Sequence, residues 1–133
     1  MTKALTGHQV NPANMAITIE AGDLDPRTGA TNDYMLSVQP QADASAPKDT
    51  PAPEAVVTLL AFQYGAPAQA GFNGLTDQAL LAVLIDRMEG FEAGKYAVPE
   101  TGFALDCLRT AQMWMNSRTG ARIARGVDGT VSV

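Results

Sequence analysis

Three arginines in the C-terminal half of the sequence have a spacing that could form an anion-binding surface. Arg118, Arg122 and Arg125 are separated by four and three residues, so a helix would place them on one face. Guanidinium groups donate paired hydrogen bonds to phosphate oxygens, and the pattern therefore predicts a phosphate clamp. On the alternative interpretation, these arginines lie on a frayed last turn, where cations stabilise the helix dipole. The same spacings continue backwards along an apolar stripe of Met115, Ala111, Leu108 and Ala104.

An aromatic residue on an earlier predicted helix offers a second element of a nucleotide site. Phe91 ends the apolar face of that helix, and its spacing alone favours a place in the core. An antiparallel second subunit could instead bring its arginine row toward this ring, so that stacking and a phosphate clamp meet in one site. Nearby in the sequence, Trp114, Met113 and Met115 form an aromatic and thioether cluster that indicates either core or a subunit interface.

The remaining reactive side chains do not combine into a catalytic or metal-binding set. His8 is the one histidine of the chain, which excludes a Ser–His–Asp or Cys–His arrangement, and Cys107 is expected to be buried in the core. The loop GAPAQAGFNG matches neither glycine-rich phosphate motif. We therefore expect no catalytic residue, no metal, no cofactor and no enzymatic activity. The carboxylates of the first helix are typical of a solvated face: Asp86, Glu89 and Glu92.

Short alternating segments predict the elements that precede these helices. Apolar and β-branched residues indicate antiparallel strands at 16–21, 34–38 and 56–64. Residues 39–53 contain four prolines among small and polar residues and are expected to form a mobile loop between strands.

From residue 76 the apolar period changes to that of a helix. The spacing predicts one helix at 76–94, ended by Gly94 in a left-handed conformation, and a second at 99–125, ended by Gly126. The short connection between them predicts an antiparallel pair. The predicted fold class is α+β, with a small antiparallel β-sheet followed by a long antiparallel helical hairpin, in an oligomer.

Composition and charge limit the classes of function. The 133 residues have a net charge of −5, which argues against binding to a nucleic-acid polymer or a membrane surface. Residues 106–126 nevertheless hold four arginines and one aspartate, which favours a small anionic ligand. The single cysteine and the lack of a long apolar run predict a cytoplasmic protein. We expect one domain over 1–133, with 1–15 flexible and 126–133 a polar tail. Because only 17% of residues are charged, we also expect surface reserved for other copies of the chain.

The region from about 71 to 130 resembles a known family. Its matching features are the NG before the first helix, IDR followed by GF and a short loop, the dipeptide MW, and the ending SRTGARIARGVDGT. These resemble phage Thoeris anti-defence sponges of the first-described type, which share a helical hairpin with the phage anti-CBASS cyclic-nucleotide sponge. The loop at 39–53 looks like an insertion relative to the compact sheet of that family.

The resemblance implies a protein that sequesters an immune signal without cleaving it. Members bind cyclic ADP-ribose isomers, and some also bind cyclic di- or trinucleotides at separate sites, so that Thoeris or CBASS effectors of the host are not activated. They assemble as dimers or hexamers and act in the cytoplasm of the bacterial host. Phe91 matches the aromatic that stacks on the base, and Arg118 and Arg122 match the pair that holds the diphosphate. Thr101 stands where relatives carry Asn, which calls one ligand hydrogen bond into question. The alternative is a phage structural or assembly protein with an oligomerising hairpin.

Overall fold

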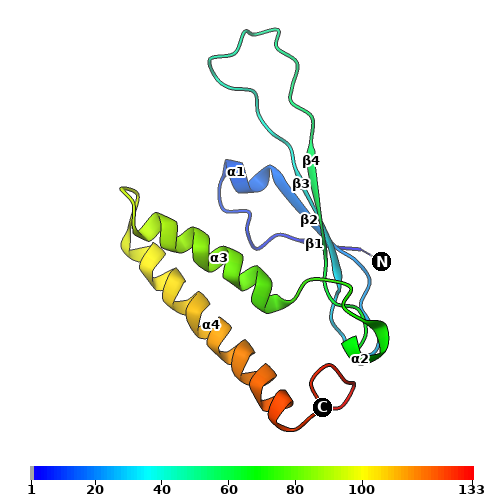
Figure 1. Ribbon diagram of the computed structural model, residues 1–133. Helices are drawn as coiled ribbons and strands as arrows, with labels where there is room; N and C mark the ends of the chain where they lie inside the picture. The colour runs from blue at the N-terminus through cyan, green and yellow to red at the C-terminus, as the bar shows by residue number, and fades with distance from the viewer. Residues whose placement is uncertain (1) are drawn as a thin grey trace. The chain divides into compact units, whose positions relative to one another are not determined.

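The computed structural model describes residues 2–133, which contain four strands and four helices (Figure 1). The chain divides into two compact units, of which the first ends at Ala61 and the second runs from Phe62 to Val133. An antiparallel sheet forms most of the first unit and two long helices form most of the second, so the predicted α+β class is confirmed. That the whole chain is one domain stays a prediction.

The sheet has the strand order β1-β2-β3-β4, and each neighbouring pair is antiparallel. Burial alternates along the strand ITIEA, and the register places Ile19 directly opposite Leu36 on one face. The predicted strands at 16–21 and 34–38 are confirmed to within one residue at each end. The strands are β1 (Lys3–Leu5), β2 (Ile17–Ala21), β3 (Asp33–Val38) and β4 (Val56–Ala61).

The last strand is shorter than predicted. The sequence predicts a strand at 56–64, but the chain leaves the sheet after Ala61, where β4 ends. Phe62 instead forms a single parallel bridge with Leu75. Gly74 lies against this crossing so closely that an added Cβ atom would be 2.5 Å from the Phe62 carbonyl carbon. A side chain at Gly74 would therefore force the two segments apart.

Residues 2–15 contain a strand and a short helix, which the sequence did not indicate, while the flexibility of the segment stays a prediction. β1 pairs with β2, and the short helix α1 (Pro12–Met15) follows an Asn11 cap, whose side chain accepts a hydrogen bond from the Asn14 amide at 2.9 Å. His8 donates from Nε2 to the Ile17 carbonyl oxygen at 2.8 Å. A strand of three residues is too short to show an alternating pattern, so hydrophobic period could not reveal β1. Met1 lies outside the described residues.

Two connections of the sheet differ in how firmly they are held. Residues 39–53 contain no helix or strand, as predicted, and their mobility stays a prediction. The turn after β2 instead buries the carboxylate of Asp25, which is 4% exposed. Asp25 accepts hydrogen bonds from the Arg27 guanidinium at 2.8 and 3.1 Å, from the Arg27 amide at 2.9 Å and from Asn32 at 3.3 Å. The Arg27 side chain is the main reason that the pKa of Asp25 falls from 3.8 to about 2.

The second unit is a hairpin of α3 (Asp77–Glu92) and α4 (Pro99–Ala124), preceded by the short helix α2 (Pro67–Ala70). The two long helices lie side by side in opposite directions (Figure 1). Two contacts between them are consistent with this antiparallel pairing: Gln78 donates to the Thr119 hydroxyl at 2.9 Å, and Arg109 pairs with Glu89 at 3.0 Å. Both predicted helices are therefore confirmed, with ends that differ by at most two residues.

The two glycines predicted to end these helices behave differently. Gly126 has φ of +71°, and the Val127 amide donates to the Arg122 carbonyl at 3.0 Å, which closes the end of α4 as predicted. Gly94 has no positive φ, so its prediction is wrong. Its amide bonds the Phe91 carbonyl at 3.1 Å and continues the right-handed turn, since the C-cap Ala93 keeps helical angles.

The hairpin buries little of its apolar surface. Ile85 and Leu105 are its buried hydrophobic residues among those described, while Phe103, Trp114 and Ile123 are each more than 60% exposed. A helical pair with so much exposed apolar surface is typical of a protein that packs against another chain. None of the helices in residues 2–133 combines the length and the hydropathy that crossing a membrane requires.

Candidate ligand-binding site at the ends of the helical hairpin

The loop end of the hairpin carries the aromatic candidate and the threonine. Phe91 lies in the last turn of α3 and Thr101 in the first turn of α4. Phe91 is 42% exposed, so its predicted place in a core is wrong for this chain, because its ring lies where the hairpin ends. The guanidinium carbon of Arg87 lies 5.6 Å from the centre of the Phe91 ring. That distance permits a cation–π contact, which orients the ring at the surface.

The three arginines lie at the opposite end of α4. Arg118 and Arg122 belong to its last two turns, and Arg125 is its C-cap residue. Arg122 is half-buried, whereas Arg118 and Arg125 are exposed. The prediction that all three continue the packing face is therefore wrong for Arg118 and Arg125. Thr119 is half-buried on the packing face where Arg118 was expected. Counting four turns of about 3.6 residues from the buried Leu105 reaches position 119, and Arg118 lies to one side of this face.

The arginine end of α4 is hydrogen-bonded to the segment that follows it. Arg122 lies in the last turn, where a cation can stabilise the helix dipole, so that part of the alternative interpretation stays open. Arg122 donates to three backbone oxygens of the following segment: Ser132 at 2.7 Å, Val127 at 3.0 Å and Thr130 at 3.1 Å. Arg125 donates to the Val133 backbone oxygen at 2.8 Å. The segment at 127–133 is thus folded over the guanidinium groups.

The sequence did not predict that the 127–133 segment folds over these guanidinium groups, because the acceptors are backbone carbonyls, which every residue has. The available signal was the pair of glycines at 126 and 129, which have φ of +71° and +73° and permit the chain to reverse. The Gly129 carbonyl also accepts a hydrogen bond from the Ala68 amide at 2.9 Å, which attaches the segment to α2.

The two ends of the hairpin are too far apart to form one site in a single chain. Thr101 and Arg118 are separated by 17 positions of one helix, or about 25 Å at 1.5 Å per residue. Arg122 is one further turn away. One ligand can therefore contact Phe91 and the arginines together only if a second copy contributes one of the two groups.

The local positive charge is smaller than the sequence suggested, but it remains at the end of α4. Arg109 is paired with Glu89 of α3 and is separated from the other arginines by more than two helical turns. Arg118, Arg122 and Arg125 form no ion pair with an Asp or Glu within the part of the chain that the structure describes. Arg118 is therefore the most available of the three to an anion, whereas Arg122 and Arg125 already donate to backbone oxygens of the 127–133 segment.

Other candidates from the sequence do not add to this site. Cys107 is exposed, so its predicted burial is wrong: Leu105, two positions earlier, faces α3 in its place. Trp114 and Met113 are 66% and 55% exposed, which leaves the interface interpretation of their cluster and removes the core one. Residues 2–133 contain no group of three or more His, Cys, Asp or Glu that could hold a metal ion.

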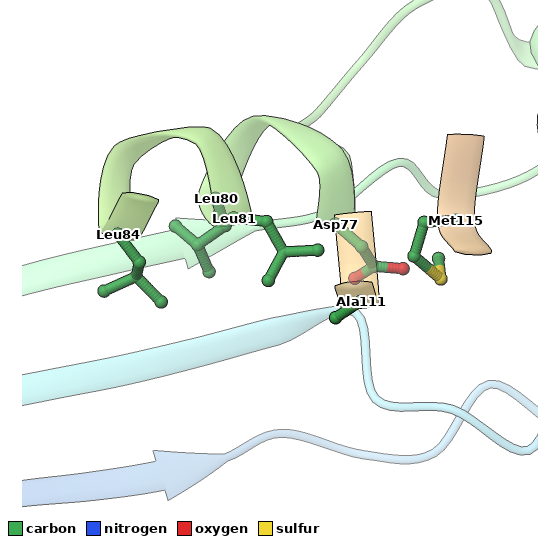
Figure 2. A pocket seen from close by; sticks show the side chains of 6 residues that line it. All are labelled: Asp77, Leu80, Leu81, Leu84, Ala111 and Met115. Atoms are coloured by element: carbon green, nitrogen blue, oxygen red, sulfur yellow. The ribbon is translucent and has the colours of Figure 1, made fainter. Parts of the chain in front are cut away.

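A separate apolar pocket lies between α3 and α4. Its volume is about 330 Å³, and Figure 2 shows leucines of α3 on one side and residues of α4 on the other. None of its lining residues belongs to the candidate site. The lining consists of Asp77, Leu80, Leu81, Leu84, Ala111 and Met115.

Comparisons with known proteins bear on the matched half of the chain. No protein-family model matches the chain. The chain is similar to Thoeris anti-defense 1 of Bacillus phage SBSphiJ7, with 38% identity over 69 residues, which are 52% of this chain and 49% of the relative. The chain thus spans about half the length of the curated relative that it matches. This similarity supports the resemblance to the Thoeris anti-defence sponge family that the sequence motifs indicated.

Proposed function

We propose that the chain is a phage anti-defence protein that binds and sequesters a cyclic nucleotide immune signal without cleaving it. The ligand would be a cyclic ADP-ribose isomer or a cyclic di- or trinucleotide, and its removal would keep the Thoeris or CBASS effectors of the host inactive. The protein would act in the cytoplasm of the bacterial host. The relative named Thoeris anti-defense 1 supports the anti-defence role. The unpaired charge at the end of α4 supports an anionic ligand.

The two proposed arginines offer different numbers of donors to a phosphate. Arg118 is exposed, and all five of its N–H groups can face a ligand. Arg122 uses three of its five for the 127–133 segment, which leaves one on Nε and one on Nη1. Arg118 would therefore provide the paired contact to a diphosphate, and Arg122 would add single contacts next to it. Arg125 would contribute charge at the edge.

Phe91 would complete the site from a second copy. Its exposed ring offers a face on which a purine can stack, a contact that contributes about 1–3 kcal/mol. Thr101, in the first turn of α4, offers a hydroxyl that can donate one hydrogen bond and accept others. In a homo-oligomer, the stacking end of one hairpin would meet the arginine end of its neighbour, and each ligand would be enclosed between two chains.

Calorimetric titration tests the proposal with a panel of cyclic ADP-ribose isomers, cyclic dinucleotides and cyclic trinucleotides. We expect the unmodified protein to bind at least one of them, and the double variant R118A/R122A to lose that binding. Arg109→Ala is the matched control, because it removes an arginine of the same helix that is engaged with Glu89. Bound ligand released by denaturation should be chemically intact. Failure to bind any member of the panel would contradict the proposal.

The second candidate is a phage structural or assembly protein, and one observation favours it. Phe103, Trp114 and Ile123 expose a large apolar area that an oligomerising hairpin would bury. On that account the arginines would pair with Asp or Glu of a neighbouring copy. R118A/R122A would then dissociate the assembly in the absence of any nucleotide. The sponge proposal instead predicts that the double variant keeps its mass and loses its ligand.

A further inference from the structure

One aromatic side chain of the second unit is almost completely exposed. Phe72 is 95% exposed and lies in the loop between α2 and α3. Neither the stacking site nor the arginine end of α4 includes it. A large apolar side chain in this position exposes hydrophobic area to water, which is unfavourable unless another surface covers it.

The loop that carries Phe72 is held by hydrogen bonds and is not a loose segment. Asn73 accepts from the Tyr64 amide at 2.8 Å and donates to the Tyr64 carbonyl at 2.7 Å through its side chain. Gln63 accepts from the Asn73 amide at 3.0 Å and donates to the Gly71 carbonyl at 2.7 Å. These contacts fix the backbone on both sides of Phe72. The ring is therefore presented outward by an ordered loop, which lowers the entropic cost of placing it in a partner.

The same unit contains a pocket of matching chemistry. The space between α3 and α4 has a volume of about 330 Å³ and is lined mainly by leucines, with Ala111 and Met115 opposite (Figure 2). A dry cavity of about 150 Å³ is sufficient for a benzene ring. Leu84 at this pocket is itself 42% exposed, so the pocket opens to the surface. A benzyl side chain would fit within about half of this volume and bury apolar area on both sides.

We infer that Phe72 of one copy inserts into the α3–α4 pocket of a second copy, and that the exchange is reciprocal. Both surfaces belong to one chain, so a two-fold axis would form the contact twice. The loop at 63–75 contains no charged residue, and Asp77 is the one charged residue of the pocket lining, so no like charges meet. This contact would build the homo-oligomer on which the proposed function rests.

The contact would be one part of a larger interface. Each Phe72 ring would bury about 200 Å² of its own surface and cover about 200 Å² of the pocket that receives it. The two reciprocal contacts would therefore remove about 800 Å² from water. Stable interfaces begin near 1,200 Å², so neighbouring exposed side chains such as Val83 and Trp114 must supply the rest. Phe72 would serve as the anchor of this surface, as buried aromatics do in most interfaces.

Cross-linking between two differently tagged chains tests the inference. In a Cys107→Ser background, one chain carries Ala70→Cys, an exposed position two residues before the intact Phe72 ring, and the other Met115→Cys, so each has a single thiol. A short thiol-specific cross-linker should join the two chains into a mixed dimer. Tyr96→Cys, on the exposed loop between α3 and α4, replaces Ala70→Cys as the control and should give at least tenfold less product. Equal yields, or no mixed dimer, would overturn the inference.

Substitution of the anchor gives a second measurement. Phe72→Ala should weaken the self-association constant at least tenfold by light scattering, whereas Tyr96→Ala should leave it unchanged. Because Phe72 makes almost no contact within its own chain, the melting temperature extrapolated to low concentration should not change. An unchanged association constant for Phe72→Ala would overturn the inference.

Nucleotide titrations of the same samples separate this inference from the proposed function. A protein that cross-links through residue 70 but binds no cyclic nucleotide contradicts the proposed function alone. A protein that binds a cyclic nucleotide without this cross-link contradicts the inference alone.

Discussion

Replacing Arg122 by lysine should loosen the 127–133 segment while the helix that carries it stays intact. The guanidinium group holds three backbone oxygens at 2.7–3.1 Å, and a lysine ammonium in its place can reach one of them. Two of these three contacts are exposed, so each contributes about 0.7 kcal/mol, toward the lower end of the range for such hydrogen bonds. Losing two contacts therefore costs about 1.4 kcal/mol, which is a tenfold change in an equilibrium constant.

Amide hydrogen exchange measures this change directly. The Thr130 amide donates to the Val127 carbonyl at 3.1 Å and the Ser132 amide to the Thr130 hydroxyl at 3.3 Å, so both report on the folded segment. In Arg122→Lys we expect both to exchange about tenfold faster, while amides in the middle of α4 keep their rates. Arg118→Lys is the matched control, because Arg118 makes no hydrogen bond to the segment among the described residues. Unchanged rates at Thr130 and Ser132, or equal acceleration by both variants, would refute this reasoning.

Two further predictions concern the stability of each unit. Gly126→Ala should lower the free energy of unfolding by about 1 kcal/mol, because φ at this position is +71° and alanine is strained there. Gly120→Ala lies in the interior of α4 with open space around it, so it should raise the free energy of unfolding by about 0.5–1 kcal/mol. Thermal melting that gives both changes the same sign would contradict this pair of predictions. The first unit should lose stability as the pH falls from about 4 towards 2. Folding lowers the pKa of Asp25 from 3.8 to about 2, so the ionised carboxylate stabilises the fold fully above about pH 4, and this stabilisation disappears as Asp25 is protonated. Circular dichroism should show this loss in the wild type and a flatter profile over the same interval in Asp25→Asn; identical profiles would exclude the Asp25 turn as its cause.

The parts of the fold that could be predicted are those in which one long pattern dominates. The 3.6-residue period over α3 and α4 extends for many turns, and the glycine at 126 ends the second helix with the left-handed angle that its position implies. β1 and the end of β4 could not be predicted in the same way. A three-residue strand has no measurable period, and the close approach of Gly74 to Phe62, which diverts the chain, joins residues 12 positions apart.

The candidate site shows the same division between local pattern and distant contact. The spacing of Arg118, Arg122 and Arg125 correctly placed them near one end of a helix. It could not show that Arg122 is engaged by backbone oxygens, because those acceptors are common to every residue. The helical period alone predicts Cys107 and Phe91 in the core, but a helix in a two-helix hairpin has only one covered side, and both residues are exposed. Their exposure follows from the small number of packed elements.

A complementation experiment tests most directly the claim that two copies share each ligand site. Phe91→Ala and R118A/R122A each lack one half of every site, so neither protein alone should bind the nucleotide. In a mixed dimer, one of the two sites receives an intact Phe91 and intact arginines. Random mixing makes half of the dimers mixed, so calorimetry should find about one bound nucleotide per four chains, against about one per chain in the wild type. A mixture that binds none would contradict the shared site, as would full binding by either variant alone.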